Sequence, residues 1–443
     1  MVRIGLTPSR VSGDNDAGRF FRRAGATPLP HGTQRLMQTL LSERRLWRGR
    51  RIHPESATIA SGYFWFYAGV GAFTPYTALY YQHLGFSGIE LGLLTALPAL
   101  GTALTGPFWG MAADALSAHR AILRTVLAIA AVVSLALAQI TSYLPFLLTL
   151  GILAFALVPV PSLMDSYAVS VAERGGHGYG VLRIFGSIGF TVMVLIMGAV
   201  MAGGMSNRFI YAYAVCHMLA LGAVFLLPRL GERRPRRIMD GVGAIWSRKP
   251  FLLLLLVAYM MASGVAILNM YLGIHIRSLG SGTDVVGTAF AVSAMSELPV
   301  IGFGTLIMSR IGARRMIIIA LVAYIVRFSM LAVAPDAGWV IASQLLHGLS
   351  FAMFLVASVN LAHRLVGGEL AATAQALLGT MSFGFGNITG SLVGGALLDV
   401  LGTRTLYSGV VLLMAAALAV YVIGGRLLSA ERYEPASERP ASG

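Results

Sequence analysis

Three residues whose side chains can bind or transfer a proton stand inside long apolar stretches. Glu297 lies near the middle of Val285–Met308, while Arg327 and His347 lie in the next two apolar stretches. About 20 apolar residues can cross a bilayer as a helix, and a carboxylate at that depth costs roughly 2.5–3.5 kcal/mol on insertion scales. Such a group usually faces a water-filled cavity or a charged partner. The three residues therefore indicate a proton site within a transporter.

The composition places the whole chain in a membrane. Of its 443 residues 56% are hydrophobic and only 12% are charged, and the mean hydropathy is +0.75. A soluble domain carries about 25% charged residues, so we expect an all-α integral membrane protein. The single cysteine excludes a disulfide within the chain, and no Cys/His cluster has metal-ligand spacing. Without a GxxxxGK[ST] loop, a metal motif or a soluble module, we expect no cofactor, no direct use of ATP and no enzyme activity.

The net charge of +15 comes almost entirely from arginine. Nucleic acid would be one reason for it, but arginine-rich cytoplasmic loops are the interpretation that fits a membrane protein, and we expect no nucleic-acid partner. The basic loops contain Arg120, Arg174, Arg229–Lys249, Arg310–Arg315 and Arg364. By the positive-inside rule they lie in the cytoplasm, so we expect a multi-pass protein of the cell (inner) membrane with both termini in the cytoplasm.

Twelve apolar stretches long enough to span a membrane are predicted. They are Thr58–Leu84, Ile89–Ala113, Ala121–Thr141, Leu144–Ala172, Tyr179–Ala202, Phe209–Pro228, Phe251–Ile276, Val285–Met308, Met316–Val333, Trp339–Val366, Ala372–Leu398 and Thr405–Leu428.

These stretches divide the chain into two halves and three connecting or terminal segments. We expect six helices in 58–228 and six in 251–428, joined by a cytoplasmic linker at 229–250, with a cytoplasmic tail at 429–443. Residues 1–57 are basic and lack the apolar core of a signal peptide. They are interpreted as a disordered tail, with an organelle transit peptide and a true start at Met37 as alternatives.

The two halves are related by a repeat at an offset of 195 residues. Leu84-Gly85 matches Leu279-Gly280, and at the same offset Gly92 matches Gly287 and Gly189-Phe190 matches Gly384-Phe385. Two six-helix halves in parallel repeat predict the major facilitator architecture, with a substrate site between them near the middle of the membrane.

The chain resembles the major facilitator transporters of the phenylpropionate permease group and, more distantly, lactose permease. The resemblance covers residues 61–428. It rests on the runs from Gly178 to Phe190, Gln344 to Phe351 and Thr373 to Leu378, and on a degenerate loop motif from Pro107 to Asp114. By this resemblance Glu297, Arg327 and His347 fall on helices 8, 9 and 10, where relatives carry proton-coupling groups. Asp165 and Arg183 resemble the acid and arginine that relatives use for substrate.

Each of these residues also has a structural interpretation. Glu297 could pair with Arg327 only to hold two helices together. His347 could relay a proton, donate a hydrogen bond to substrate, or be a core histidine. Asp165 and Arg183 could form an ion pair that closes the inner gate instead of a substrate clamp.

Neutral polar side chains inside the stretches are further candidates for contacting a solute. Asn269 and Asn387 could bind it, although such amides more often join neighbouring helices. Tyr67 could stack on an aromatic or sugar ring.

The sequence thus predicts a proton-coupled symporter that imports a small organic solute by alternating access. An aromatic acid such as phenylpropionate, a sugar and a nucleoside all fit an arginine-containing cavity. A proton-driven exporter remains an alternative, although Gly186-Ser-Ile-Gly189 lacks the proline of the usual antiporter motif. A non-transporting sensor or scaffold is the alternative from another class. The expected partners are the solute, protons and membrane lipid, and a monomer suffices because each chain carries both halves.

Overall fold

The computed structural model describes residues 54–115, 118–173, 179–227, 248–366 and 370–430. Most of the predicted N-terminal tail, nearly all of the linker and the C-terminal tail from residue 431 lie outside the described residues. By its contacts the chain divides between His53 and Pro54, and everything described belongs to the second unit.

The first group of helices begins four residues earlier than the sequence predicts, at Pro54. Its members are α3 (Pro54–His83), α4 (Gly88–Ala115), α5 (His119–Leu137), α6 (Tyr143–Leu157), α7 (Val160–Glu173), α8 (Tyr179–Met201) and α9 (Arg208–Phe225). The predicted fourth stretch is divided into α6 and α7 next to Pro159. A proline supplies no backbone N–H and its ring displaces the preceding turn, so the helix breaks there.

The second group contains the ionisable residues of interest. Its members are α11 (Lys249–Ser278), α12 (Thr283–Ala332), α13 (Ala337–Gln344), η1 (Gly348–Ala352), α14 (Met353–Val366), α15 (Ala371–Gly379), η3 (Thr380–Gly386) and α16 (Asn387–Ala430). The short segments η1 and η3 are π-helical. No strand occurs in the described ranges.

Two of the predicted loops are single glycine breaks. α12 and α16 each join two predicted stretches, and each contains one glycine with non-helical angles, Gly312 at φ 79° and Gly402 at φ 67°. Positive φ is costly for a residue with a Cβ, so a glycine reverses the chain here without a longer loop. Each of these elements is therefore two helices joined by a tight turn.

Ten stretches of the described chain are long and apolar enough to cross a membrane. One of them, Thr373–Gly425, has 53 residues and contains the break at Gly402. The 30-residue helix α3 is not among the ten. The all-α membrane fold is confirmed, and the number twelve stays a prediction.

Large apolar side chains face outward along these helices. Ile188, Leu195, Val422 and Ile423 are 44–76% exposed, and they belong to both groups of helices. Exposed apolar surface on this scale is unfavourable in water. In a bilayer it is the expected outer face, because lipid tails solvate it.

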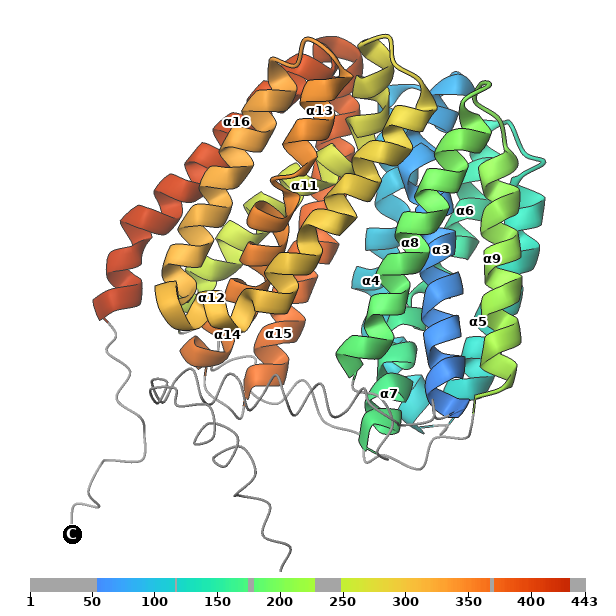
Figure 1. Ribbon diagram of the computed structural model, residues 1–443, viewed down its shortest axis with the longest axis horizontal. Coiled ribbons are helices and arrows are strands. Elements are labelled where there is room, and N and C mark those ends of the chain that lie inside the picture. The colour runs from blue at the N-terminus through green and yellow to red at the C-terminus, as the bar shows by residue number, and fades with distance from the viewer. Residues whose placement is uncertain (1–53, 116–117, 174–178, 228–247, 367–369, 431–443) are drawn as a thin grey trace, which may run out of the picture. The chain divides into compact units, whose positions relative to one another are not determined.

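The two groups of helices gather on opposite sides and diverge toward the end where α7 and α15 lie (Figure 1). Their contacts concentrate near the α3–α4 turn. A Cβ on Gly92 would lie 2.7 Å from the carbonyl oxygen of Ser391, and one on Gly287 would lie 2.7 Å from that of Val194. Gly92 and Gly287 are equivalent in the repeat, so both copies use the same position to approach the other half closely.

The turns that precede these two glycines also correspond. Gly85 and Gly280 have φ values of 82° and 80°, a conformation that glycine adopts without a steric penalty. The 195-residue repeat thus appears in the backbone as well as in the sequence.

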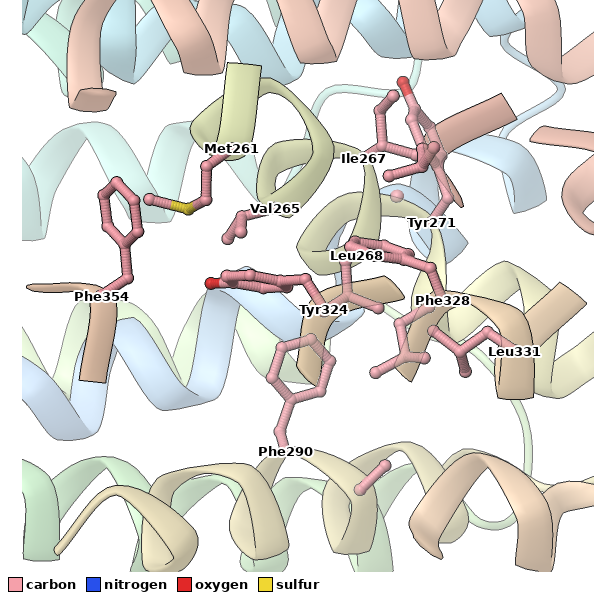
Figure 2. Close-up of a cluster of buried hydrophobic side chains, with 14 of the residues drawn as sticks. Met261, Val265, Ile267, Leu268, Tyr271, Phe290, Tyr324, Phe328, Leu331 and Phe354 are labelled. Atoms are coloured by element: carbon pink, nitrogen blue, oxygen red, sulfur yellow. The ribbon is translucent and has the colours of Figure 1, made fainter. Parts of the chain in front are cut away.

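Aromatic residues fill the core of the second group. Tyr324 and Phe328 stack with ring centroids 6.0 Å apart, and both are fully buried. Figure 2 shows them beside Val265 and Leu268 of α11, with Phe290 of α12 on the other side. This core fixes the two halves of α12 against α11, and those halves carry Glu297 and Arg327.

Candidate functional site

The three ionisable residues singled out by the sequence form one hydrogen-bonded chain. Nη1 of Arg327 lies 2.6 Å from Nδ1 of His347, and Nε2 of His347 lies 2.6 Å from Oε1 of Glu297. The histidine ring therefore stands between two groups of opposite charge. The connection between Glu297 and Arg327 that the sequence allows runs through His347.

The hydrogen bonds determine where the protons lie. A guanidinium can only donate, so Nδ1 of His347 must accept. A neutral imidazole has one N–H, which must then be on Nε2 and must donate to Glu297. The oxygen that receives this bond is an acceptor, as in an ionised carboxylate. The carbonyl oxygen of a protonated carboxyl group can accept this bond too, so the geometry fixes the histidine and not the charge of Glu297. The arrangement is a neutral histidine that accepts from Arg327 and donates to Glu297.

Two neutral side chains orient the guanidinium. Nη2 of Arg327 donates to Oε1 of Gln344 and lies 3.5 Å from Oγ of Ser293. Ser293 donates to the same Gln344 oxygen across 2.8 Å. The amide nitrogen of Gln344 is itself held by the carbonyl oxygen of Val340 at 3.2 Å and by Oγ of Ser343 at 2.9 Å. Arg327 is thereby aimed at His347.

Helical spacing puts these groups on common faces. Ser293 and Glu297 are four residues apart on α12. Gln344 is the last residue of α13, and His347 follows three residues later, directly before η1. Residues at these spacings lie one above the other along a helix. Each of the two segments therefore presents one residue for the guanidinium and one for the proton chain.

A close backbone contact brings the two helices together at this point. The N–H of Gly348 donates to Oγ of Ser296 across 3.0 Å. A Cβ on Gly348 would lie 2.0 Å from the carbonyl oxygen of Ser296, closer than any side chain can approach. Gly348 also begins the π-helical segment η1, and such segments often mark functional sites.

Burial falls along the chain from the arginine to the carboxylate. Arg327 is 1% exposed, whereas the side chains of His347 and Glu297 are 9% and 25% exposed. Protons can be exchanged with a water-filled space only where a titratable group reaches it. Glu297 is the most exposed of the three groups and is the end at which such an exchange would take place.

A cavity of about 300 Å³ lies within the second group of helices. Asn269 of α11 and Asn387 at the start of α16, both expected to contact solute, line it. Its other walls come from α11, η1, α14, α15 and η3. They are Met261, Ala262, Val265, Phe351, Phe354, Leu355, Ser358, Val359, Gln375, Leu378, Gly379, Ser382 and Phe383.

Asp165, Arg183 and Tyr67 come together in the first group of helices, through a residue that the sequence analysis did not select. Tyr63 donates from its hydroxyl to Oδ1 of Asp165 across 2.5 Å. The guanidinium of Arg183 lies over the ring of Tyr67, 4.1 Å from its centroid, and 5.7 Å from that of Tyr63. Within the described chain no ion pair joins Asp165 to Arg183. Asp165 and Arg183 instead each contact a tyrosine: Tyr63 donates to the acid, and Tyr67 lies under the guanidinium.

The two groups of candidate residues remain separate. Among the residues that the structure describes, no hydrogen bond, ion pair or ring contact joins the Asp165 group to the Glu297 chain. They belong to different halves, as expected for two sides of a central site.

Sequence reasoning missed Gln344, Ser293 and Tyr63. For Gln344 and Ser293 a signal exists, because each is polar, lies inside an apolar stretch and is spaced by three or four residues from an ionisable one. Tyr63 gives no such signal, because its partner is 102 residues away.

The family of the chain follows from a match between residues 57–408 and the model of the MFS_1 like family. The chain belongs to that family. Its resemblance to the major facilitator transporters is thereby confirmed, and it is a multi-pass membrane protein and a secondary transporter of small solutes.

The relatives of this transporter are named for different solutes. The maltose permease of Geobacillus stearothermophilus is 28% identical over 76% of the chain and 86% of its own length. The probable 3-phenylpropionic acid transporter of Escherichia coli (strain K12) is 23% identical over 68% and 80%. The crystal structure of the nucleoside transporter NupG has the same fold, with a TM-score of 0.75 and 18% identity over 86% of this chain and all of that one.

Proposed function

We propose that this transporter imports a small organic solute together with a proton. The observation that carries the proposal is the chain Arg327–His347–Glu297. It contains a fixed cation, a ring that can exchange a proton at either nitrogen, and a carboxylate at the exposed end. Midmembrane groups of this kind are functional by default because they are costly to bury.

The conformation supports a step order. If the basic loops lie in the cytoplasm, the contacts between the halves near the α3–α4 turn close the external end. This is then an inward-facing state, and its ionised Glu297 corresponds to a proton already released to the cytoplasm. When the external end opens, Glu297 takes up a proton from outside, solute binds, and the halves rock back.

The Asp165 group is proposed to contact solute from the opposite half. Tyr67 supplies a ring face, and Arg183 supplies a cation that can bind a carboxylate if it leaves the tyrosine rings. The solutes printed for relatives, maltose, nucleosides and 3-phenylpropionic acid, define the panel to test.

We further propose that the protein lies in the inner membrane with both termini in the cytoplasm and acts as a monomer. Lipid, protons and solute are then its partners. The loop charges support this orientation, and the two complete halves within one chain support the monomer.

Proton movement in liposomes tests the proposal. Purified protein is reconstituted around a pH-sensitive dye, and maltose, uridine or 3-phenylpropionate is added outside. We expect one solute to acidify the lumen with wild-type protein and to lose that effect with Glu297→Gln. Acidification that survives in Glu297→Gln would assign the carboxylate a structural role only. Alkalinisation of the lumen on solute entry would instead identify an exchanger, which includes the exporter alternative.

A further inference from the structure

Phe351 belongs to both the solute cavity and the proton chain. Its ring lines the cavity in the second group of helices. The same ring stacks on His347, with ring centroids 5.2 Å apart and planes within 4° of parallel. One side chain therefore has the cavity on one side and the proton-bearing imidazole on the other.

The cavity itself offers hydrogen bonds but no charge. Its polar lining consists of the amides Asn269, Gln375 and Asn387 and the hydroxyls of Ser358 and Ser382. Phe351, Phe354 and Phe383 supply ring faces. Of the described residues that line it, none is ionisable.

The guanidiniums of the two candidate groups are both occupied outside the cavity. Arg327 is 1% exposed and donates to His347 and Gln344, and Arg183 lies over Tyr67. A carboxylate placed in this cavity would lose its water without gaining a cation, which is costly. A ring that carries hydroxyl or amide groups would instead satisfy the amides at its edge and stack on the phenylalanines.

We propose that the proton and an uncharged, hydrogen-bonding ring solute bind on opposite sides of Phe351, and that this ring couples them. The inference rests on the proposed function and adds the solute class and the coupling residue. An occupant that presses on Phe351 turns the stacked His347 ring. That movement lengthens its bond to Glu297 and frees the carboxylate to bind a proton.

The local backbone allows such a movement. Phe351 and His347 are four residues apart. Phe351 belongs to η1, which runs from Gly348 to Ala352, and His347 directly precedes it. A π-helical turn holds one more residue than an α-helical turn and is strained relative to it. A shift between the two forms would rotate both rings together.

The solute class is tested with a pair of compounds that differ only in charge. Uptake of 3-phenylpropionate and of its amide, 3-phenylpropionamide, is compared with uptake of maltose and uridine in wild-type liposomes. We expect uncharged compounds to be transported, and the acid to be carried and to compete at least about 10-fold less well. Preference for the acid over the amide would overturn the inference.

The coupling role is tested by the ratio of protons to solute taken up. Phe351→Leu keeps an apolar side chain but removes the stack, and we expect the ratio to fall at least about twofold. Phe351→Tyr keeps a ring and should restore it. Phe383→Leu removes another ring from the cavity and should raise KM by about 2- to 10-fold with an unchanged ratio.

The outcomes separate this inference from the proposed function. If wild-type protein moves no protons, symport fails and the coupling role fails with it. If wild-type protein couples and Phe351→Leu keeps the full ratio, symport stands and the role of Phe351 is refuted. If Phe351→Leu does not fold, the comparison of 3-phenylpropionate with its amide still decides the solute class.

Discussion

Gly348 lies so close to Ser296 that a single added carbon would meet a backbone oxygen at 2.0 Å. This contact holds η1 against α12 and sets the distance between His347 and Glu297. The site therefore requires a glycine at position 348 as much as it requires the ionisable groups.

Gly348→Ala is expected to separate the two helices and abolish proton-coupled uptake, at a cost of about 1–3 kcal/mol in stability. The matched control is Gly302→Ala on α12, where an added Cβ meets nothing within 4 Å. That change should be neutral or stabilise the helix by about 0.5–1 kcal/mol. Thermal unfolding in detergent and liposome uptake measure both. Full coupling in Gly348→Ala would show that the close contact is not required.

The proposed ionised state of Glu297 predicts a specific pair of stabilities. Arg327→Met leaves the Glu297 carboxylate without its compensating cation and should destabilise the protein by about 3–5 kcal/mol. Adding Glu297→Gln removes the unbalanced charge and should recover most of that loss, while transport stays uncoupled. Unfolding temperatures of the two single variants and the double variant form the test. Additive losses would contradict the ionised state proposed for Glu297.

Asp399 links the two halves by accepting a hydrogen bond from the backbone N–H of Gly88 across 2.6 Å. The acid lies on α16 and caps the start of α4, so Asp399→Ala should weaken this end by about 0.5–2 kcal/mol. Hydrogen exchange at the start of α4 should then quicken by about 2- to 30-fold.

Asp336→Ala serves as the control for that experiment. Asp336 caps α13 by accepting from Gly338 and Trp339, all within one half. Its loss should speed exchange in α13 and leave α4 unchanged. Unchanged exchange at α4 in Asp399→Ala would mean that the carboxylate does not hold the halves together.

Tyr63→Phe is expected to leave Asp165 without the hydroxyl that donates to it, at a cost of about 1–3 kcal/mol. If Asp165 contacts solute, KM should rise as well, because the carboxylate is free to reorient. Tyr407→Phe is the comparison, since its buried hydroxyl has no hydrogen-bond partner in the described chain. Loss of stability without any change in KM would assign Tyr63 and Asp165 to packing alone.

The membrane architecture could be predicted from the sequence because it depends on composition and local pattern. Apolar runs of membrane-spanning length are helical wherever they occur, since lipid offers backbone groups no other partner. The repeat needed only a constant offset, and it reappears in Gly85 and Gly280. The tight turns at Gly312 and Gly402 were missed as single-residue breaks, because sequence patterns locate the ends of helices poorly.

The candidate residues could be found one at a time for a similar reason. Glu297, Arg327 and His347 stand out because ionisable groups are rare in apolar stretches. The sequence alone determined that these three residues are buried in a membrane and need partners.

Only the tertiary structure decided how those partners are arranged. It inserted His347 between Arg327 and Glu297, assigned Gln344 and Ser293 to the guanidinium, and put Tyr63 on Asp165. These contacts join helices far apart in the chain, and their geometry follows from how closely the helices pack. A sequence records which side chains are available, whereas distances such as the one at Gly348 arise only when two helices meet.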